Sequence, residues 1–240
     1  MRPSGRKNDQ LREISFDIGY APQADGSCFV KCGNTHILCT ATLEERVPPF
    51  LKGKGEGWLT AEYGMLPCST DRRMDREAAR GKQSGRTQEI QRLIGRSLRA
   101  ALDFKSMGEK QIIVDCDVIR ADGGTRTAAI TGGFLALYQA AVKGAQAGIL
   151  NSMPIINQVA AISCGLYKGE AVADLDYLED SDADADANFV MTSKGEIIEI
   201  QGTAEKAPFS HGQFTDIMQL AQNGISELCA KQADIMKQIF

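Results

Sequence analysis

The sequence lacks the features that mark several common classes of protein. It has no apolar run of about 18 residues and no N-terminal signal peptide, so we expect no membrane span and no export. It has no Cys-x-x-Cys pair, only two histidines and no Asn-x-Ser/Thr site, which excludes a clustered zinc site and N-glycosylation. These absences predict a cytoplasmic protein whose seven cysteines are reduced and mostly buried.

Several motifs of nucleotide and hydrolase chemistry are also missing. There is no Walker A sequence, no Gly-x-Ser-x-Gly elbow, no Gly-x-Gly-x-x-Gly fingerprint and no EF-hand loop. The usual nucleotide hydrolases, esterases and dehydrogenases are therefore excluded. What remains is a chain of 240 residues with 43% hydrophobic residues, enough for one large domain or two similar halves.

The net charge of −4 conceals a strong separation of charge along the chain. Segment 72–99 is densely basic, whereas segment 170–186 holds eight acidic residues and no basic one. A dense basic block in a mildly acidic protein indicates a localised site for a polyanion. The alternative is a solvated helix surface. The arginines of the block are Arg72, Arg73, Arg76, Arg80, Arg86, Arg92, Arg96 and Arg99.

The most informative stretch runs from Asp115 to Gly133. Its apolar residues predict a strand ending near Ile119, Gly123 and Gly124 predict a turn, and 125–142 predicts a helix. A glycine turn at a helix N-terminus directs backbone N–H groups towards a bound anion. Arg126 adds a guanidinium suited to phosphate. The alternative is an ordinary strand-to-helix connection with an exposed arginine.

A second predicted helix begins after Ser84 and places Arg86 near its N-terminus. Apolar residues between 90 and 102 fall on one face, and Arg92, Arg96 and Arg99 share another. A cation at a helix N-terminus opposes the helix dipole unless an anion is bound there. Arg86 is therefore a second candidate ligand for an anion.

The remaining pattern predicts an α+β fold built from two related β-then-α units, with halves 1–105 and 106–240. Strands are expected at 26–32 and 35–43 as a hairpin, and at 57–64, 156–167, 170–175, 188–192 and 196–200. Segment 1–13 is a basic arm, 67–85 a long polar connection, 176–186 an acidic loop, and the chain closes with a long helix. In the acidic loop, Asp180 and Asp186 are candidates to protonate a leaving oxygen or to hold Mg²⁺, although spacing alone does not separate them from Asp182 and Asp184.

The chain resembles the ribonuclease PH family in motifs that occur in order over nearly its whole length. They are Arg2-Pro-Ser-Gly-Arg6, Glu56-Gly-Trp-Leu-Thr-Ala-Glu-Tyr-Gly-Met-Leu-Pro67, Gly85-Arg-Thr-Gln-Glu-Ile-Gln-Arg92, the stretch 115–133, Glu179-Asp-Ser181 with Asp186-Ala-Asn188, and Gln201-Gly-Thr-Ala-Glu205. The resemblance implies a duplicated fold like ribosomal protein S5 domain 2 in a single domain spanning 1–240. It also implies a phosphate-dependent 3′→5′ exoribonuclease that trims tRNA precursors and releases nucleoside diphosphates.

The resemblance carries expectations for individual residues and partners. Inorganic phosphate is expected at Arg86, Gly124, Thr125 and Arg126, with acid or Mg²⁺ assistance from Asp180 and Asp186. RNA is expected at the arginines of the basic block, and the assembly is expected to be a hexamer, a trimer of dimers. The family often has arginine where this chain has Cys68; this departure concerns the strength of tRNA binding and not the reaction.

Two other functions remain open at this point. A non-catalytic RNA-binding ring subunit would be expected to lack one of the phosphate arginines or aspartates, and this chain has them all. A metal-dependent hydrolytic nuclease would release nucleoside monophosphates without phosphate.

Overall fold

The computed structural model describes residues 1–239, and within them the strands form two sheets. The first sheet has the order β1-β2-β3-β5-β4 and is antiparallel except for the parallel pair β4 and β5. The second has the order β7-β6-β8-β9 and is antiparallel throughout. The strands are β1 (Ile14–Ile18), β2 (Gly26–Cys32), β3 (Thr35–Glu44), β4 (Trp58–Met65), β5 (Gln111–Arg120), β6 (Val159–Tyr167), β7 (Glu170–Ala173), β8 (Ala185–Thr192) and β9 (Ile197–Ala204).

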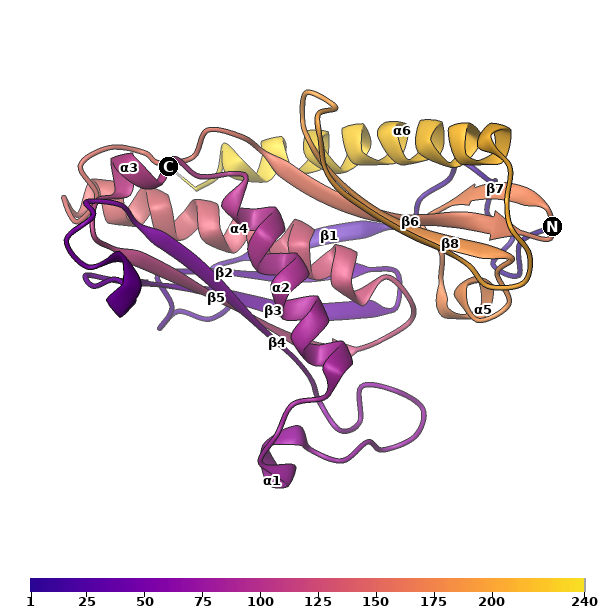
Figure 1. Cartoon of the computed structure of the whole chain (residues 1–240), viewed down its shortest axis with the longest axis horizontal. Coiled ribbons are helices and arrows are strands. Elements are labelled where there is room, and N and C mark those ends of the chain that lie inside the picture. The colour runs from indigo at the N-terminus through magenta and orange to yellow at the C-terminus, as the bar shows by residue number, and fades with distance from the viewer. Residues whose placement is uncertain (240) are drawn as a thin grey trace.

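Three long helices cover the sheets, and short ones occupy the connections (Figure 1). The helix α2 packs on β4, α6 packs on β6 and β7, and α4 contacts both β2 and β3 of the first sheet and β6 of the second. The predicted α+β class is therefore confirmed. The helices are η1 (Pro49–Leu51), α1 (Glu77–Arg80), α2 (Gly85–Arg99), α3 (Phe104–Met107), α4 (Thr125–Gln146), α5 (Tyr177–Asp180) and α6 (His211–Met236).

The helix α4 is the centre of the core because it lies between the two sheets. Its sequence is apolar on nearly every face, and almost all of its residues are buried, as expected for a helix with no solvent side. Close packing requires small residues here: a Cβ added at Gly132 would lie 2.6 Å from Val30 Cγ1. The position of α4, including its N-terminus, is thus set by contacts from both sheets.

A buried glutamine of α6 joins the two layers. Gln232 is fully buried, and its Nε2 donates to the carbonyl oxygens of Thr131 in α4 at 2.9 Å and Val159 in β6 at 3.1 Å. Gln158 Nε2 donates to Gln232 Oε1 at 3.0 Å. Each polar atom of this side chain has a partner, so its burial carries no unpaired group.

The sheets divide the chain at a different place from the predicted halves. β5 lies between β3 and β4, and α4 packs against β2 and β3, although both elements follow residue 106. The boundary between sheets therefore falls in the connection from α4 to β6, and not at 105. The strand and the helix of this stretch were predicted correctly, but their local patterns hold no information on pairing with strands distant in the chain, such as β3 and β4.

Other expectations meet mixed outcomes. The predicted hairpin is confirmed, since β2 and β3 pair across Gly33 and Asn34. The segment 176–186 is not a simple loop: it contains α5, and Asp186 already lies on β8. The polar connection 67–84 projects from the body and carries the single turn α1 (Figure 1). Six of the cysteines are buried and Cys68 is exposed.

The basic arm at the N-terminus is not a free tail. Arg2 and Arg12 are both buried, and they pair with acidic residues that precede and form α5. No helix among residues 1–239 is long and apolar enough to cross a membrane.

Candidate functional site

A polar cleft of about 2000 Å³ gathers most of the predicted site residues. Its walls come from the start of α2, the turn before α4, α5, the start of β8 and the end of β9. Residues from distant parts of the chain thus meet on one surface. The predicted residues in its lining are Arg72, Arg86, Gly124, Thr125, Arg126, Asp180 and Asp186.

The turn before α4 leaves the helix N-terminus open to the cleft. Gly123 and Gly124 have φ values of +74° and +64°, a left-handed conformation that favours glycine. Gly124 is the N-cap residue, and no side chain caps this helix, whereas Ser84 caps α2 and Ser210 caps α6. The first N–H groups of α4 therefore have no side-chain acceptor and can bind an anion.

Gly123 is also required by the contact between the turn and α5. A Cβ at this position would lie 2.7 Å from the carbonyl carbon of Asp176 and 2.8 Å from Tyr177 N. The turn consequently packs backbone to backbone against the start of α5. This contact brings the open helix N-terminus close to the element that carries Asp180.

The two arginines of the predicted anion site have different environments. Arg86 lies in the first turn of α2 and is exposed. The Arg126 side chain is mostly buried, and its Nη1 donates to Glu89 Oε1 and to Gln201 Oε1, both at 3.2 Å. These long contacts hold the guanidinium in place and leave its other nitrogens to bind a ligand.

The carboxylates of Asp180 and Asp186 face this positive side from two elements. Asp180 ends α5 and Asp186 lies near the start of β8. Partial loss of solvation in the cleft wall raises the pKa of Asp180, against the lowering effect of Arg86 and Arg126, although Asp180 is an exposed residue. Burial and the charge of Asp180 raise the pKa of Asp186. The two groups therefore interact, and each holds its proton more readily than a free aspartate.

The carboxylates of Asp180 and Asp186 suit Mg²⁺, which keeps water and substrate ligands, but they are too few to hold a metal ion with protein ligands alone. Within the described residues there is no group of three or more histidine, cysteine, aspartate or glutamate side chains that could hold a metal. Mg²⁺ commonly binds one or two carboxylates and completes its shell with water and substrate phosphates. Burial, and after it the charge of Asp180, raises the pKa of Asp186, and a cation bound by both carboxylates would offset the repulsion between them.

The structure separates the predicted RNA-binding arginines into three groups. Arg72 lines the cleft. Arg73, Arg76 and Arg80 lie on the projecting connection and α1 outside its lining, and Asp75 pairs with Arg73 and Arg80. The arginines of α2 lie farther along that helix, also outside the lining: Arg92, Arg96 and Arg99.

Two of the α2 arginines have structural partners. Arg96 donates to both carboxylate oxygens of Glu199, at 2.6 and 2.7 Å. Arg99 lies over the Trp58 ring at 4.9 Å and donates to Leu59 O. These contacts occupy the guanidinium groups with protein, and the structure does not bring them together with the cleft.

The cleft also contains residues that the sequence pattern did not single out. Asn34, Arg120 and Tyr177 line it, and Tyr177 is exposed at the start of α5. A signal existed for Arg120, because it ends β5 just before the glycine turn. Asn34 comes from the hairpin turn of the first sheet, and nothing local relates it to this site.

This arrangement is that of an α+β protein with a polar cleft in which the predicted anion site and two carboxylates lie together. Models of the two domains of the 3′ exoribonuclease family match residues 10–143 and 157–224. The chain is 62% identical over 232 residues to ribonuclease PH of Rhodospirillum rubrum, with 97% of each covered. The chain therefore belongs to the 3′ exoribonuclease family. It is an enzyme, a phosphorolytic exoribonuclease of RNA 3′ ends that acts in tRNA processing.

Solved structures show the same fold at much lower identity. Rice (Oryza sativa) Rrp46 is similar with a TM-score of 0.77 at 18% identity, covering 100% of both chains. A chain of the Archaeoglobus fulgidus exosome with RNA bound to the active site has a TM-score of 0.80 at 17% identity, covering 96% of this chain and 92% of that one. At these identities the likeness concerns the fold alone.

Proposed function

We propose that the cleft binds inorganic phosphate between Arg86, Arg126 and the backbone N–H groups at Gly124 and Thr125. A phosphate oxygen then attacks the phosphorus of the last phosphodiester of a tRNA precursor. The new P–O bond forms as the bond to the 3′ oxygen of the preceding nucleotide breaks. A nucleoside diphosphate leaves, and the shortened RNA keeps a 3′ hydroxyl. The reverse transfer uses the same groups.

One observation supports this assignment most strongly. The uncapped N-terminus of α4 and two arginines lie in the same cleft as two carboxylates of raised pKa. Attack by one anion on another requires that charge be offset and that the nucleophile be held in line. The arginines and the helix amides supply both.

Asp180 and Asp186 act on the other side of the reacting phosphorus. The departing 3′ oxygen must gain a proton, and an aspartate whose pKa is raised is a better proton donor near neutral pH. The charge of Asp180 also contributes to the raised pKa of Asp186, after burial, so the protonation of Asp186 depends on that of Asp180. Mg²⁺ held by the same two carboxylates would supply electrostatic stabilisation of charge on the leaving oxygen.

RNA is proposed to reach the cleft along the projecting connection. Arg72 lies in the cleft, and Arg73, Arg76 and Arg80 lie on the connection and α1. Cys68 is exposed and also lines the cleft, at a position where the family often has arginine. A cysteine side chain offers no phosphate contact comparable to that of an arginine, so we expect the remaining arginines to carry the electrostatic attraction.

This proposal predicts a steep salt dependence of RNA affinity. If the four arginines 72, 73, 76 and 80 each contact a phosphate, the slope of log K against log salt is about −3 for single-stranded RNA. Replacing Arg73 and Arg76 together with alanine should reduce that slope by about one to two. Fluorescence anisotropy with a 3′-tailed RNA measures both slopes. A flat response to salt would show that the block is only a solvated surface.

The proposed assembly is a hexamer, a trimer of dimers, in the cytoplasm. A chain of the archaeal exosome core has the same fold, with a TM-score of 0.77 at 17% identity, and is a precedent for this fold within a larger assembly. Large apolar side chains left exposed on this single chain, including Phe50, Ile156 and Leu178, are consistent with surfaces covered by other copies. Light scattering at several protein concentrations measures the molar mass directly.

Product analysis tests the reaction. The protein is incubated with a 3′-tailed RNA and Mg²⁺, with and without millimolar phosphate, and the released nucleotides are resolved. We expect nucleoside diphosphates, and only when phosphate is present. Monophosphates independent of phosphate would indicate hydrolysis instead. RNA that binds but releases nothing would indicate a scaffold subunit.

A further inference from the structure

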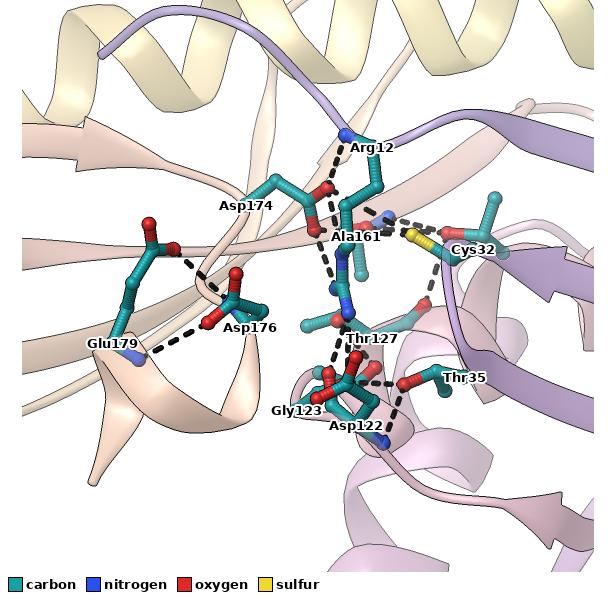
Figure 2. Close-up of polar contacts among 12 residues, drawn as sticks. Arg12, Cys32, Thr35, Asp122, Gly123, Thr127, Ala161, Asp174, Asp176 and Glu179 are labelled. Carbon is teal, nitrogen blue, oxygen red and sulfur yellow. Dashed lines mark hydrogen bonds and ion pairs between the residues drawn. The ribbon is translucent and has the colours of Figure 1, made fainter. Parts of the chain in front are cut away.

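The turn 122–124 before α4 (the anion turn) is held by a buried arginine of the N-terminal arm, on the side of its carbonyl groups (Figure 2). Arg12 is 8% exposed, and it pairs in a bidentate way with Asp174, its Nε and Nη2 lying 3.0 and 2.6 Å from the two carboxylate oxygens. Its Nη1 donates to the carbonyl oxygens of Asp122 at 2.6 Å and of Gly123 at 3.3 Å. One side chain thus contacts the turn and the segment that leads to α5.

A buried threonine holds the same turn from the first sheet. Thr35 is fully buried at the start of β3, and its hydroxyl donates to Gly123 O at 2.7 Å. The Thr35 hydroxyl oxygen in turn accepts a hydrogen bond from Asp122 N at 2.9 Å. The Gly123 carbonyl therefore has two donors, Arg12 and Thr35, from elements far apart in the sequence (Figure 2).

These contacts determine which way the turn presents its N–H groups. In a trans peptide the C=O and the following N–H point in opposite directions. Holding the Gly123 carbonyl against Arg12 and Thr35 directs the N–H of Gly124 to the other side of the turn. Gly123 and Gly124 line the cleft whereas Arg12 and Thr35 do not, so that other side is the cleft.

The same network reaches the carboxylate side of the cleft. Asp174, the partner of Arg12, has a φ of +54° and lies two residues before Asp176, the N-cap of α5. Glu179, next to Asp180, accepts from Arg2 Nε at 2.6 Å and from Arg6 Nη2 at 3.1 Å. The arm consequently joins the turn that carries the anion site to the helix that ends in Asp180.

We propose that Arg12 and Thr35 are positioning residues for the phosphate site, and that their contacts with the Asp122 and Gly123 carbonyls keep the N–H groups of the turn directed at phosphate. Neither residue touches the substrate. The inference rests on the proposed phosphate site, and it adds a specific role for the N-terminal arm and for the hairpin.

Two variants test this role by its effect on phosphate alone. Arg12→Lys keeps a charge beside Asp174 but loses the fork that spans both carbonyls, and Thr35→Val keeps the shape but loses the hydroxyl. In each variant the N–H of Gly124 is no longer held towards phosphate. The KM for phosphate should therefore rise by at least about tenfold, the effect of losing one hydrogen bond to a charged group. RNA affinity without phosphate should stay within about twofold, because the RNA-binding arginines lie elsewhere.

The controls separate positioning from general stability. Thr35→Ser restores the hydroxyl and should return the phosphate KM towards that of the unmodified protein. Arg46→Lys alters an exposed pair with Glu44 and should change nothing. Melting temperatures are measured for every variant, and Thr35→Val decides the matter if Arg12→Lys does not fold.

The outcomes also distinguish this inference from the proposed function. Nucleotide release without any dependence on phosphate in the unmodified protein would overturn both. Phosphate-dependent release with an unchanged phosphate KM in folded Thr35→Val would overturn the positioning role only. The positioning role would also be overturned if Thr35→Val raised the phosphate KM and lowered RNA affinity and melting temperature together, and Thr35→Ser did not restore them.

Discussion

Replacing Arg126 with alanine should reduce phosphate-dependent turnover by about 10²- to 10³-fold, the usual cost of removing one preorganised donor for a developing charge. Arg126 lies in the first turn of α4, beside the open N–H groups, and Glu89 and Gln201 hold its guanidinium in position. No other side chain on α4 can replace that charge at the same place. Single-turnover rates over a range of phosphate concentrations measure the loss.

RNA binding gives this experiment its control. Arg126→Ala should retain RNA with little change in affinity, because most of the basic block lies on other elements. Arg126→Lys should recover only part of the activity, since an ammonium is a point charge without the planar fork. Arg46→Ala, on an exposed pair with Glu44, serves as the matched arginine control. Full turnover in Arg126→Ala would refute the phosphate site.

Replacing Asp186 with asparagine should have opposite effects on activity and stability. The isosteric amide cannot donate a proton to a leaving oxygen as an acid or bind Mg²⁺ as a carboxylate, so activity should fall by about 10²- to 10⁴-fold. The protein should at the same time become more stable at neutral and alkaline pH. The reason is that burial and Asp180 disfavour the charged form of Asp186 in the folded state.

The sign of this effect follows from proton linkage. A carboxyl group whose pKa is raised by folding binds more protons in the folded state than in the unfolded state. Stability therefore falls as the pH rises from the unfolded pKa to the folded pKa. Asp180 and Asp186 therefore cost stability above their folded pKa values, and the cost disappears in acid. We expect Asp186→Asn to raise the melting temperature at pH 8 and to have little effect near pH 4.

Asp182→Asn is the matched control for this experiment. Asp182 lies in the same segment, but it is exposed, pairs with Lys206 and does not line the cleft. Its replacement should leave activity nearly unchanged and should not stabilise the protein at pH 8, since exposed ion pairs contribute little. If Asp186→Asn melted at the same temperature as the unmodified protein at pH 8, or at a lower one, the charged form of Asp186 would not be destabilising the folded state.

The sequence by itself determined the local structure and much of the chemistry. The strand, glycine turn and helix across 111–146 follow from an apolar run, two adjacent glycines and an alanine-rich segment, each of which acts over a few residues. The anion site proposed at this turn follows from the same local pattern. The ordered motifs also identified the family, because the types of residue that its members share can be read without coordinates.

Only the tertiary structure decided how these local units meet. It placed β5 and α4 with the first sheet, brought Asp180 and Asp186 from two elements opposite Arg86 and Arg126, and assigned Arg96 and Arg99 to protein partners. Arg12 and Asp174 are 162 residues apart in the chain, yet they form the buried pair behind the anion turn. An arginine in a polar segment has the same local pattern whether it is free or buried, so its partner becomes known only when the chain has folded.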